Sequence, residues 1–205
     1  QALAPSAALA ARVRCASGRF QEKCKHDEAH AGTIERALEG LRFDADVAAV
    51  LPRLLDAAHG RVGEERRAAA SALAEVPGAL DALLTAHELE HEPLARGRLL
   101  ISIGEQGGEQ ARAYLIERLT KGKKHEFAWA ALGLGLLAGE NDDAEARAAL
   151  RAAFDAASQK EKESVALALG FARDREAHGR LVKTLADSRA DRLRMFASIA
   201  LGLID

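Results

Sequence analysis

The residues of this 205-residue chain best suited to chemistry are histidines followed directly by glutamate. His125 and Glu126 come just before the apolar stretch FAWAALGLGLLAG, and His87 and His91 are each followed by Glu. Imidazole and carboxylate groups are common metal ligands. Only His125 and Glu126 stand where a helix is expected to begin, and one imidazole with one carboxylate is too small a set for a two-metal centre. We therefore predict no metal and no other cofactor.

Other chemistries lack a recognisable motif. No Ser or Cys stands in a nucleophile motif, and no glycine-rich loop joins a strand to a helix to hold phosphate. Cys24 and His26 have no second pair at the spacing of a zinc site. The prediction is a protein without catalytic residues.

The elements that must position any site are repeated along the chain. The stretch HEFAWAALGLGLLAG, which ends at Gly139, recurs in weaker forms that end at Ala74, Gly104, Gly170 and Gly202, about 30 to 35 residues apart. A second leucine-rich phrase precedes each copy. Three examples are ARAYLIERL from Ala111, ARAALRAAF from Ala146 and HGRLVKTL from His178. Each unit is therefore predicted to hold two helices.

This pairing of phrases resembles the HEAT-repeat family, in particular its short bacterial form rich in Ala and Leu, whose second helix ends in Ala-Leu-Gly. The resemblance is clear over 46–204 and loose over the first 45 residues. It implies an all-α fold, an α-solenoid with five two-helix HEAT-like repeats in 46–205 after an irregular helical cap or degenerate repeat in 1–45, all one continuous domain. In such a fold the second helices line a concave surface, and the usual role is a scaffold for other proteins.

Two enzyme classes with related folds are the alternatives. Deoxyhypusine hydroxylase, a di-iron HEAT-repeat enzyme, places several His-Glu pairs at the starts of second helices, but the positions here that match His125 hold Arg66, Glu163 and Met195. HEAT-like DNA glycosylases use a basic face with aromatic residues, whereas this chain has one Trp and one Tyr. We therefore expect a non-enzymatic protein that binds a partner protein.

Basic residues gather near the starts of the predicted second helices and suggest where the partner binds. Arg67, Arg98, Lys124 and Arg194 should form a row along the inner surface, and His125 and Trp129 lie beside it. Such a ridge would attract an acidic segment of another protein. The alternative is structural: in HEAT repeats an Asp in the turn often pairs with an Arg at the start of a second helix.

Composition limits the remaining classes. The chain is 48% hydrophobic but only 4% aromatic, and its net charge of −2 argues against nucleic acid as the partner. The longest apolar run, 127–139, is shorter than the roughly 20 residues of a membrane span. Glycines inside the second helices, such as Gly104, Gly135, Gly170 and Gly202, predict either close helix contacts or helix ends.

The two cysteines, Cys15 and Cys24, lie in the atypical first segment. They either form a disulfide or are two buried or free thiols. A disulfide and the Gln1 start favour an exported protein, but the sequence does not separate a cytoplasmic from a secreted or periplasmic location.

Overall fold

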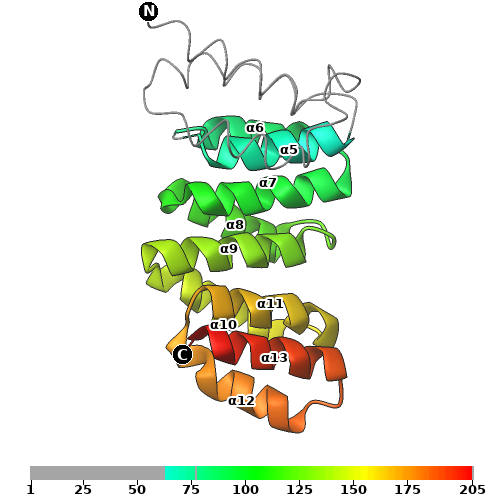
Figure 1. Ribbon diagram of the computed structural model, residues 1–205, viewed down its shortest axis with the longest axis vertical. Coiled ribbons are helices and arrows are strands. Elements are labelled where there is room, and N and C mark those ends of the chain that lie inside the picture. The colour runs from blue at the N-terminus through cyan, green and yellow to red at the C-terminus, as the bar shows by residue number, and fades with distance from the viewer. Residues whose placement is uncertain (1–62, 77, 205) are drawn as a thin grey trace, which may run out of the picture. The chain divides into compact units, whose positions relative to one another are not determined.

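The computed structural model describes residues 63–76 and 78–204, and every regular element in them is a helix (Figure 1). The predicted all-α class is confirmed over this part of the chain, which contains no strand. The predicted N-terminal cap, Cys15, Cys24 and the helix expected from Asp46 lie outside the described residues.

The described helices alternate as the two phrases predict. The second helices are α5 (Gly63–Ala74), α7 (Pro93–Gln106), α9 (Phe127–Asn141), α11 (Gln159–Phe171) and α13 (Asp191–Ile204). The first helices are α6 (Leu80–Leu89), α8 (Gly108–Lys121), α10 (Ala144–Ala156) and α12 (His178–Asp187), the last preceded by a 3-10 turn, η1 (Arg175–Ala177). The chain divides into two compact units, 1–102 and 103–205.

In the first unit, a buried arginine joins the end of α6 to α7. The Arg96 guanidinium donates hydrogen bonds of 2.6 Å to the backbone carbonyls of His87 and Glu90. Carbonyls in the last turn of a helix lack partners within that helix, so a cation there satisfies them and complements the helix dipole. The Glu92 carboxylate caps the start of α7 through the N–H groups of Leu94 and Ala95.

In the second unit, first and second helices pack in pairs, α8 with α9, α10 with α11 and α12 with α13, and α11 also packs against both α9 and α13. The core consists of leucines at helical spacing on the inward faces, such as Leu115, Leu134, Leu150 and Leu169, none of them exposed to solvent. Alanines fill the space between them, which suits a sequence with few aromatic residues.

The second helices approach one another at glycines. A Cβ on Gly135 of α9 would lie 2.5 Å from the Ala168 carbonyl oxygen of α11, and one on Gly170 of α11 would lie 2.8 Å from the Ala200 Cα of α13. Near the end of α7, Gly104 meets the backbone of Gly133 in the same way. The close helix contacts predicted at these three glycines are confirmed. Gly202 of α13 differs, since no described residue lies within 4 Å of its Cβ position.

Each turn from a second helix to the next first helix contains a residue in the left-handed region. These residues are Gly78, Gly107, Asp142 and Arg173, with φ of 76°, 69°, 52° and 49°. After α11, the Arg173 N–H bonds to the Gly170 carbonyl and the Asp174 N–H to the Leu169 carbonyl. This pattern is the Schellman motif, whose left-handed position usually holds glycine.

The described helices are too short or too polar for a membrane crossing.

Substitution of Gly135 with alanine tests the helix contact. The added Cβ collides with the backbone of α11, so we expect the free energy of unfolding to fall by about 1 to 3 kcal/mol despite the better helix propensity of alanine. The matched control is Gly179→Ala on α12, where the added Cβ has no described neighbour within 4 Å, and where we expect a gain of up to about 1 kcal/mol. Urea denaturation measures both, and equal effects at the two positions would contradict close packing at Gly135.

Candidate functional site

The predicted basic residues of the first unit are in different surroundings. Arg67 falls in α5, but its side chain lies outside the described residues. Arg98 is exposed on α7, and its guanidinium donates to the Ser71 hydroxyl at 2.6 Å. Arg96, two residues earlier, is the buried capping arginine described above and is not available to a partner.

In the second unit, Lys124, His125 and Glu126 belong to the turn before α9. Lys124 and His125 are exposed, whereas the Glu126 side chain is only 1% exposed and accepts a hydrogen bond from the Lys123 N–H. The His125 Nε2 is 3.9 Å from the Glu126 carboxylate, and Trp129 is half-buried in the first turn of α9. The pair that suggested metal binding is therefore one surface imidazole and one buried carboxylate. The described residues contain no group of three His, Cys, Asp or Glu side chains that could hold a metal.

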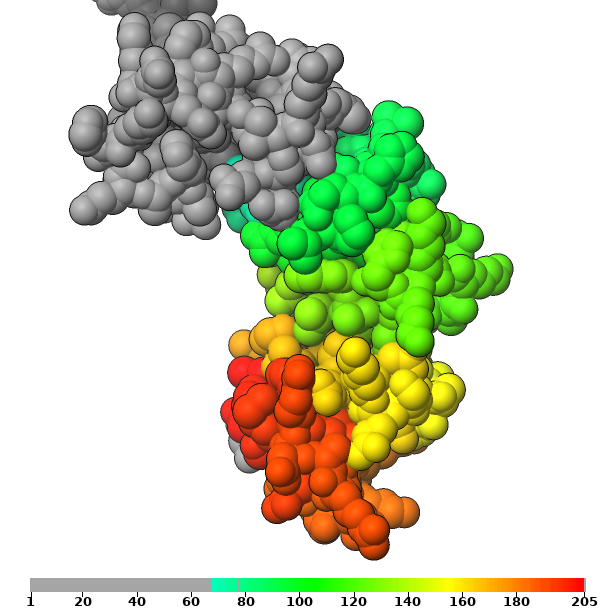
Figure 2. Space-filling model, turned by 90° about the vertical axis from the view of Figure 1, so that its right-hand side faces the viewer, coloured from blue at the N-terminus to red at the C-terminus, as the bar shows by residue number. Residues whose placement is uncertain are grey.

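Arg194 is exposed in the first turn of α13, 4.0 Å from the Asp191 carboxylate. Its neighbour Arg192 pairs with Glu163 of α11 at 3.1 Å. Figure 2 presents the side of the second unit on which the second helices begin, with the start of α13 in orange-red beside the yellow start of α11. Acidic side chains thus accompany the predicted cations here, and the row along Arg67, Arg98, Lys124 and Arg194 stays a prediction.

The turn carboxylates pair with arginines that the sequence analysis did not single out. Arg112 of α8 binds Asp143 at 2.9 Å and Glu145 at 3.0 Å. Each of these two carboxylates has a counterpart in the following turn. There, Arg151 of α10 binds Asp174 at 2.8 Å and Glu176 at 3.2 Å. We call these two groups the arginine clamps. Their signal in the sequence is the recurring Asp-x-Glu at the start of a first helix.

Asp143 is also the N-cap of α10 and accepts the Ala146 N–H at 3.0 Å. Partial burial acts to raise the pKa of its carboxyl, but hydrogen bonds from the Ala146 N–H and the Arg112 guanidinium outweigh burial and hold the pKa below its usual range. Asp174 caps η1 in the same way and is 2% exposed. Asp143 is therefore an ionised carboxylate fixed at the start of α10, and Asp174 is a buried one fixed at the start of η1.

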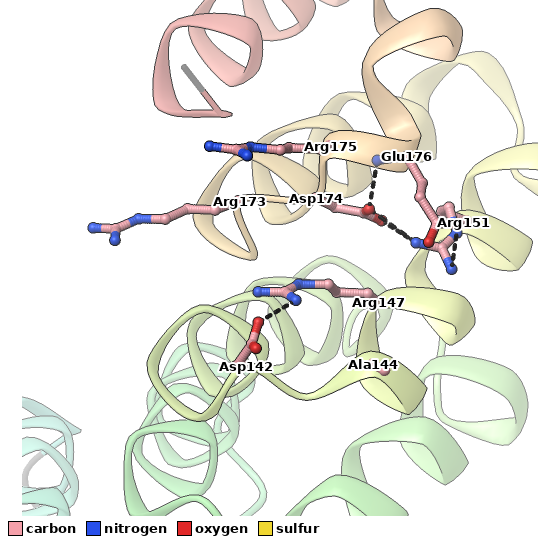
Figure 3. Close-up of a pocket in the computed structure, with 8 residues that line it drawn as sticks. All are labelled: Asp142, Ala144, Arg147, Arg151, Arg173, Asp174, Arg175 and Glu176. Atoms are coloured by element: carbon pink, nitrogen blue, oxygen red, sulfur yellow. Dashed lines mark hydrogen bonds and ion pairs between the residues drawn. The ribbon is translucent and has the colours of Figure 1, made fainter.

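Between the ends of α9 and α11 lies a pocket of about 390 Å³ (Figure 3). We call it the arginine pocket, and its lining residues are Asp142, Ala144, Arg147, Arg151, Arg173, Asp174, Arg175 and Glu176. Arg147 bonds to Asp142 and to the Ala172 carbonyl, and Arg151 belongs to a clamp. With four arginines and three acids, the pocket carries a net charge of +1.

The side chains of Arg173 and Arg175 are exposed, and neither guanidinium group makes a hydrogen bond or ion pair with any other residue that the structure describes. Figure 3 shows their guanidinium groups turned to the same side as that of Arg147, while Arg151 lies on the other side with Asp174 and Glu176. This pocket is at the ends of α9 and α11, so it is distant from the predicted site at the helix starts. It presents two guanidinium groups that are free to bind an anion.

Comparison with known proteins does not identify a family. No protein-family model matches the chain, and no curated protein matches it in sequence.

Substitution of Asp143 with asparagine separates two roles of this residue, its charge in the ion pair with Arg112 and its hydrogen bond as the N-cap of α10. Asparagine caps helices as well as aspartate, so the variant mainly loses the ion pair with Arg112. Because the pKa of Asp143 is lowered in the folded state, its contribution to stability is full above the ordinary Asp pKa of about 3.9. It is lost as the pH falls through the lowered value.

We therefore expect Asp143→Asn to be less stable than wild type at pH 7, with a smaller difference at pH 3, as measured by denaturant unfolding at several pH values. Asp142→Asn is the control, since Asp142 is exposed and its loss should change stability by about 0 to 1 kcal/mol. A deficit of equal size at pH 7 and pH 3 would rule out the charge as its cause.

Proposed function

We propose that this chain is a non-enzymatic HEAT-like repeat scaffold, and that it binds an acidic segment of another protein in the arginine pocket. Three recurring features support the repeat architecture. Second helices meet at glycines, left-handed residues follow them at Gly107, Asp142 and Arg173, and arginine clamps hold successive first-helix starts. Each feature recurs at about the spacing of the sequence phrases, as a stack of equivalent units requires.

The observation that carries the binding proposal is the pair of unengaged arginines, Arg173 and Arg175. Other arginines of the pocket are matched with carboxylates or a carbonyl, so these two supply its uncompensated charge. A guanidinium group binds a carboxylate through two parallel hydrogen bonds, which suits Asp and Glu side chains of a partner. The separation of Arg173 and Arg175 by one residue presents two such groups together.

The backbone at Arg173 adds support. Its φ of 49° is in a region that is unfavourable for residues other than glycine, and Asn and Asp tolerate it better than Arg. Glycine occupies the equivalent place at Gly107. Unfavourable backbone conformations gather at binding sites, where a side chain is needed for another purpose. An arginine at this position is costly for stability and useful for binding.

The predicted site around Lys124, His125, Trp129 and Arg194 is the rival location for the same function. Its cations are exposed, but Arg194 is near Asp191 and Arg192 pairs with Glu163. The two locations are at opposite ends of the second helices, so charge reversal can test them separately.

Charge reversal at each location, with a fluorescent hexaglutamate peptide as the probe, tests the proposal by fluorescence anisotropy. The double variant Arg173→Glu, Arg175→Glu should bind the peptide at least about tenfold more weakly. That is the change in affinity expected from losing one charge-assisted hydrogen bond. Lys124→Glu with Arg194→Glu changes the net charge equally and should leave most of the affinity. Added salt should weaken wild-type binding. Equal losses in both double variants would contradict a specific pocket.

A single substitution, Arg173→Gly, should separate stability from binding. Glycine adopts a positive φ without strain, so we expect the free energy of unfolding to rise by up to about 1 kcal/mol. Hexaglutamate binding should fall, because one of the two free guanidinium groups is lost. The measurements are urea denaturation and anisotropy on the same preparation. A variant that gains stability and keeps full affinity would show that Arg173 is not a binding residue.

A further inference from the structure

One face of α13 is apolar and exposed. Met195, Ile199 and Leu203, four residues apart along the helix, are 50%, 43% and 40% exposed. They are three of the four large apolar side chains that are exposed among the described residues 103–204, the fourth being Val182 of α12. Their spacing places them on one side of the helix. Contiguous apolar surface of this kind marks an interaction site.

Small residues form a shallow notch along the same face. Ser198 and Gly202, also four residues apart, are exposed beside the apolar side chains. Small residues at this spacing allow the backbone of another helix to approach closely, as they do in paired transmembrane helices.

The notch continues an arrangement already present within the chain. Gly139 of α9 and Gly170 of α11 match Gly202 of α13 in the repeated phrase, and each is covered by the backbone of the next second helix. Ala166, four residues before Gly170, is completely buried, whereas Ser198, four residues before Gly202, is exposed. The face of α13 therefore has the shape that receives a helix at the two earlier positions, and no described residue covers it.

We propose that this face binds the same face of a second copy of the chain, forming a two-fold symmetric dimer. No charged residue lies between Met195 and Leu203, so two identical faces meet without repulsion between like charges. The cations that precede the face lie close to acids, Arg192 paired with Glu163 and Arg194 near Asp191, so they are matched within one chain. An acidic segment would find no free cation on the apolar face itself, which separates this surface from the arginine pocket.

Two-fold symmetric dimers, in which the same surface patch of each subunit contacts that of the other, are the commonest symmetric protein assemblies. In the proposed pair, the α13 helices cross at Ser198 and Gly202, and Ile199 of each copy packs beside the notch of the other. The proposed dimer face includes none of the residues that line the arginine pocket, and the dimer does not rest on the proposed function.

The test is the mass of the full chain in solution, measured by light scattering after size-exclusion chromatography and by sedimentation equilibrium. We expect a mass twice the 21.8 kDa of one chain, falling toward the single mass on dilution. Ile199→Glu places a charge in the centre of the face, and Gly202→Leu fills the notch. Both variants should be monomeric at concentrations where the wild type is dimeric.

The control is Val182→Glu, which adds the same charge at an exposed apolar residue of α12 and should leave the dimer intact. Circular dichroism and thermal melting establish that each variant is folded, and Gly202→Leu is expected to fold because its side chain meets no described residue. A wild-type chain that is monomeric at every concentration overturns the proposal. So does a dimer that survives both Ile199→Glu and Gly202→Leu.

Discussion

The direct backbone contact between neighbouring second helices is the constraint on which the described structure depends. At Gly135 and Gly170 no side chain separates the helices, so the distance between them is set by the backbones themselves. The surrounding core can then be built mainly from alanine and leucine, because a short distance between helices leaves little room for aromatic residues between them. The low aromatic content of the chain is a consequence of this spacing.

The arginine clamps act on the first helices, and the glycine contacts act on the second helices. Whereas the glycines fix how closely second helices lie, Arg112 and Arg151 connect one first helix to the start of the next through carboxylates. Each clamp carboxylate also caps a helix or turn, so a single side chain sets both the beginning of an element and its position relative to its neighbour. These partly buried contacts are less screened than exposed ion pairs.

Helix positions were predictable from the sequence, because leucine spacing, Pro93 and Asp191 mark them locally. The sequence predicts a helix start near Lys124 and His125, but α9 begins at Phe127, since Glu126 bonds to the backbone of Lys123 and holds 122–126 as a turn. The clamps were not predictable. Arg112 and Arg147 occupy the same place in ARAYL and ARAAL, yet Arg112 reaches the next Asp-x-Glu and Arg147 binds the Ala172 carbonyl. Which arginine reaches a carboxylate depends on how two helices are offset, and no local pattern specifies that offset. The free charge of Arg173 and Arg175 was missed for the same reason.

The two kinds of arginine contact differ in their response to acid. Arg96 binds backbone carbonyls, which do not titrate in the physiological or acidic range, so the joint between α6 and α7 keeps its charge-assisted hydrogen bonds at low pH. The Arg112 clamp depends on Asp143 and loses this partner once the pH falls through the lowered pKa of the Asp143 carboxyl. Acid should therefore loosen the connection between α8 and α10 before it loosens the α6–α7 joint, so that partial unfolding begins in the second unit.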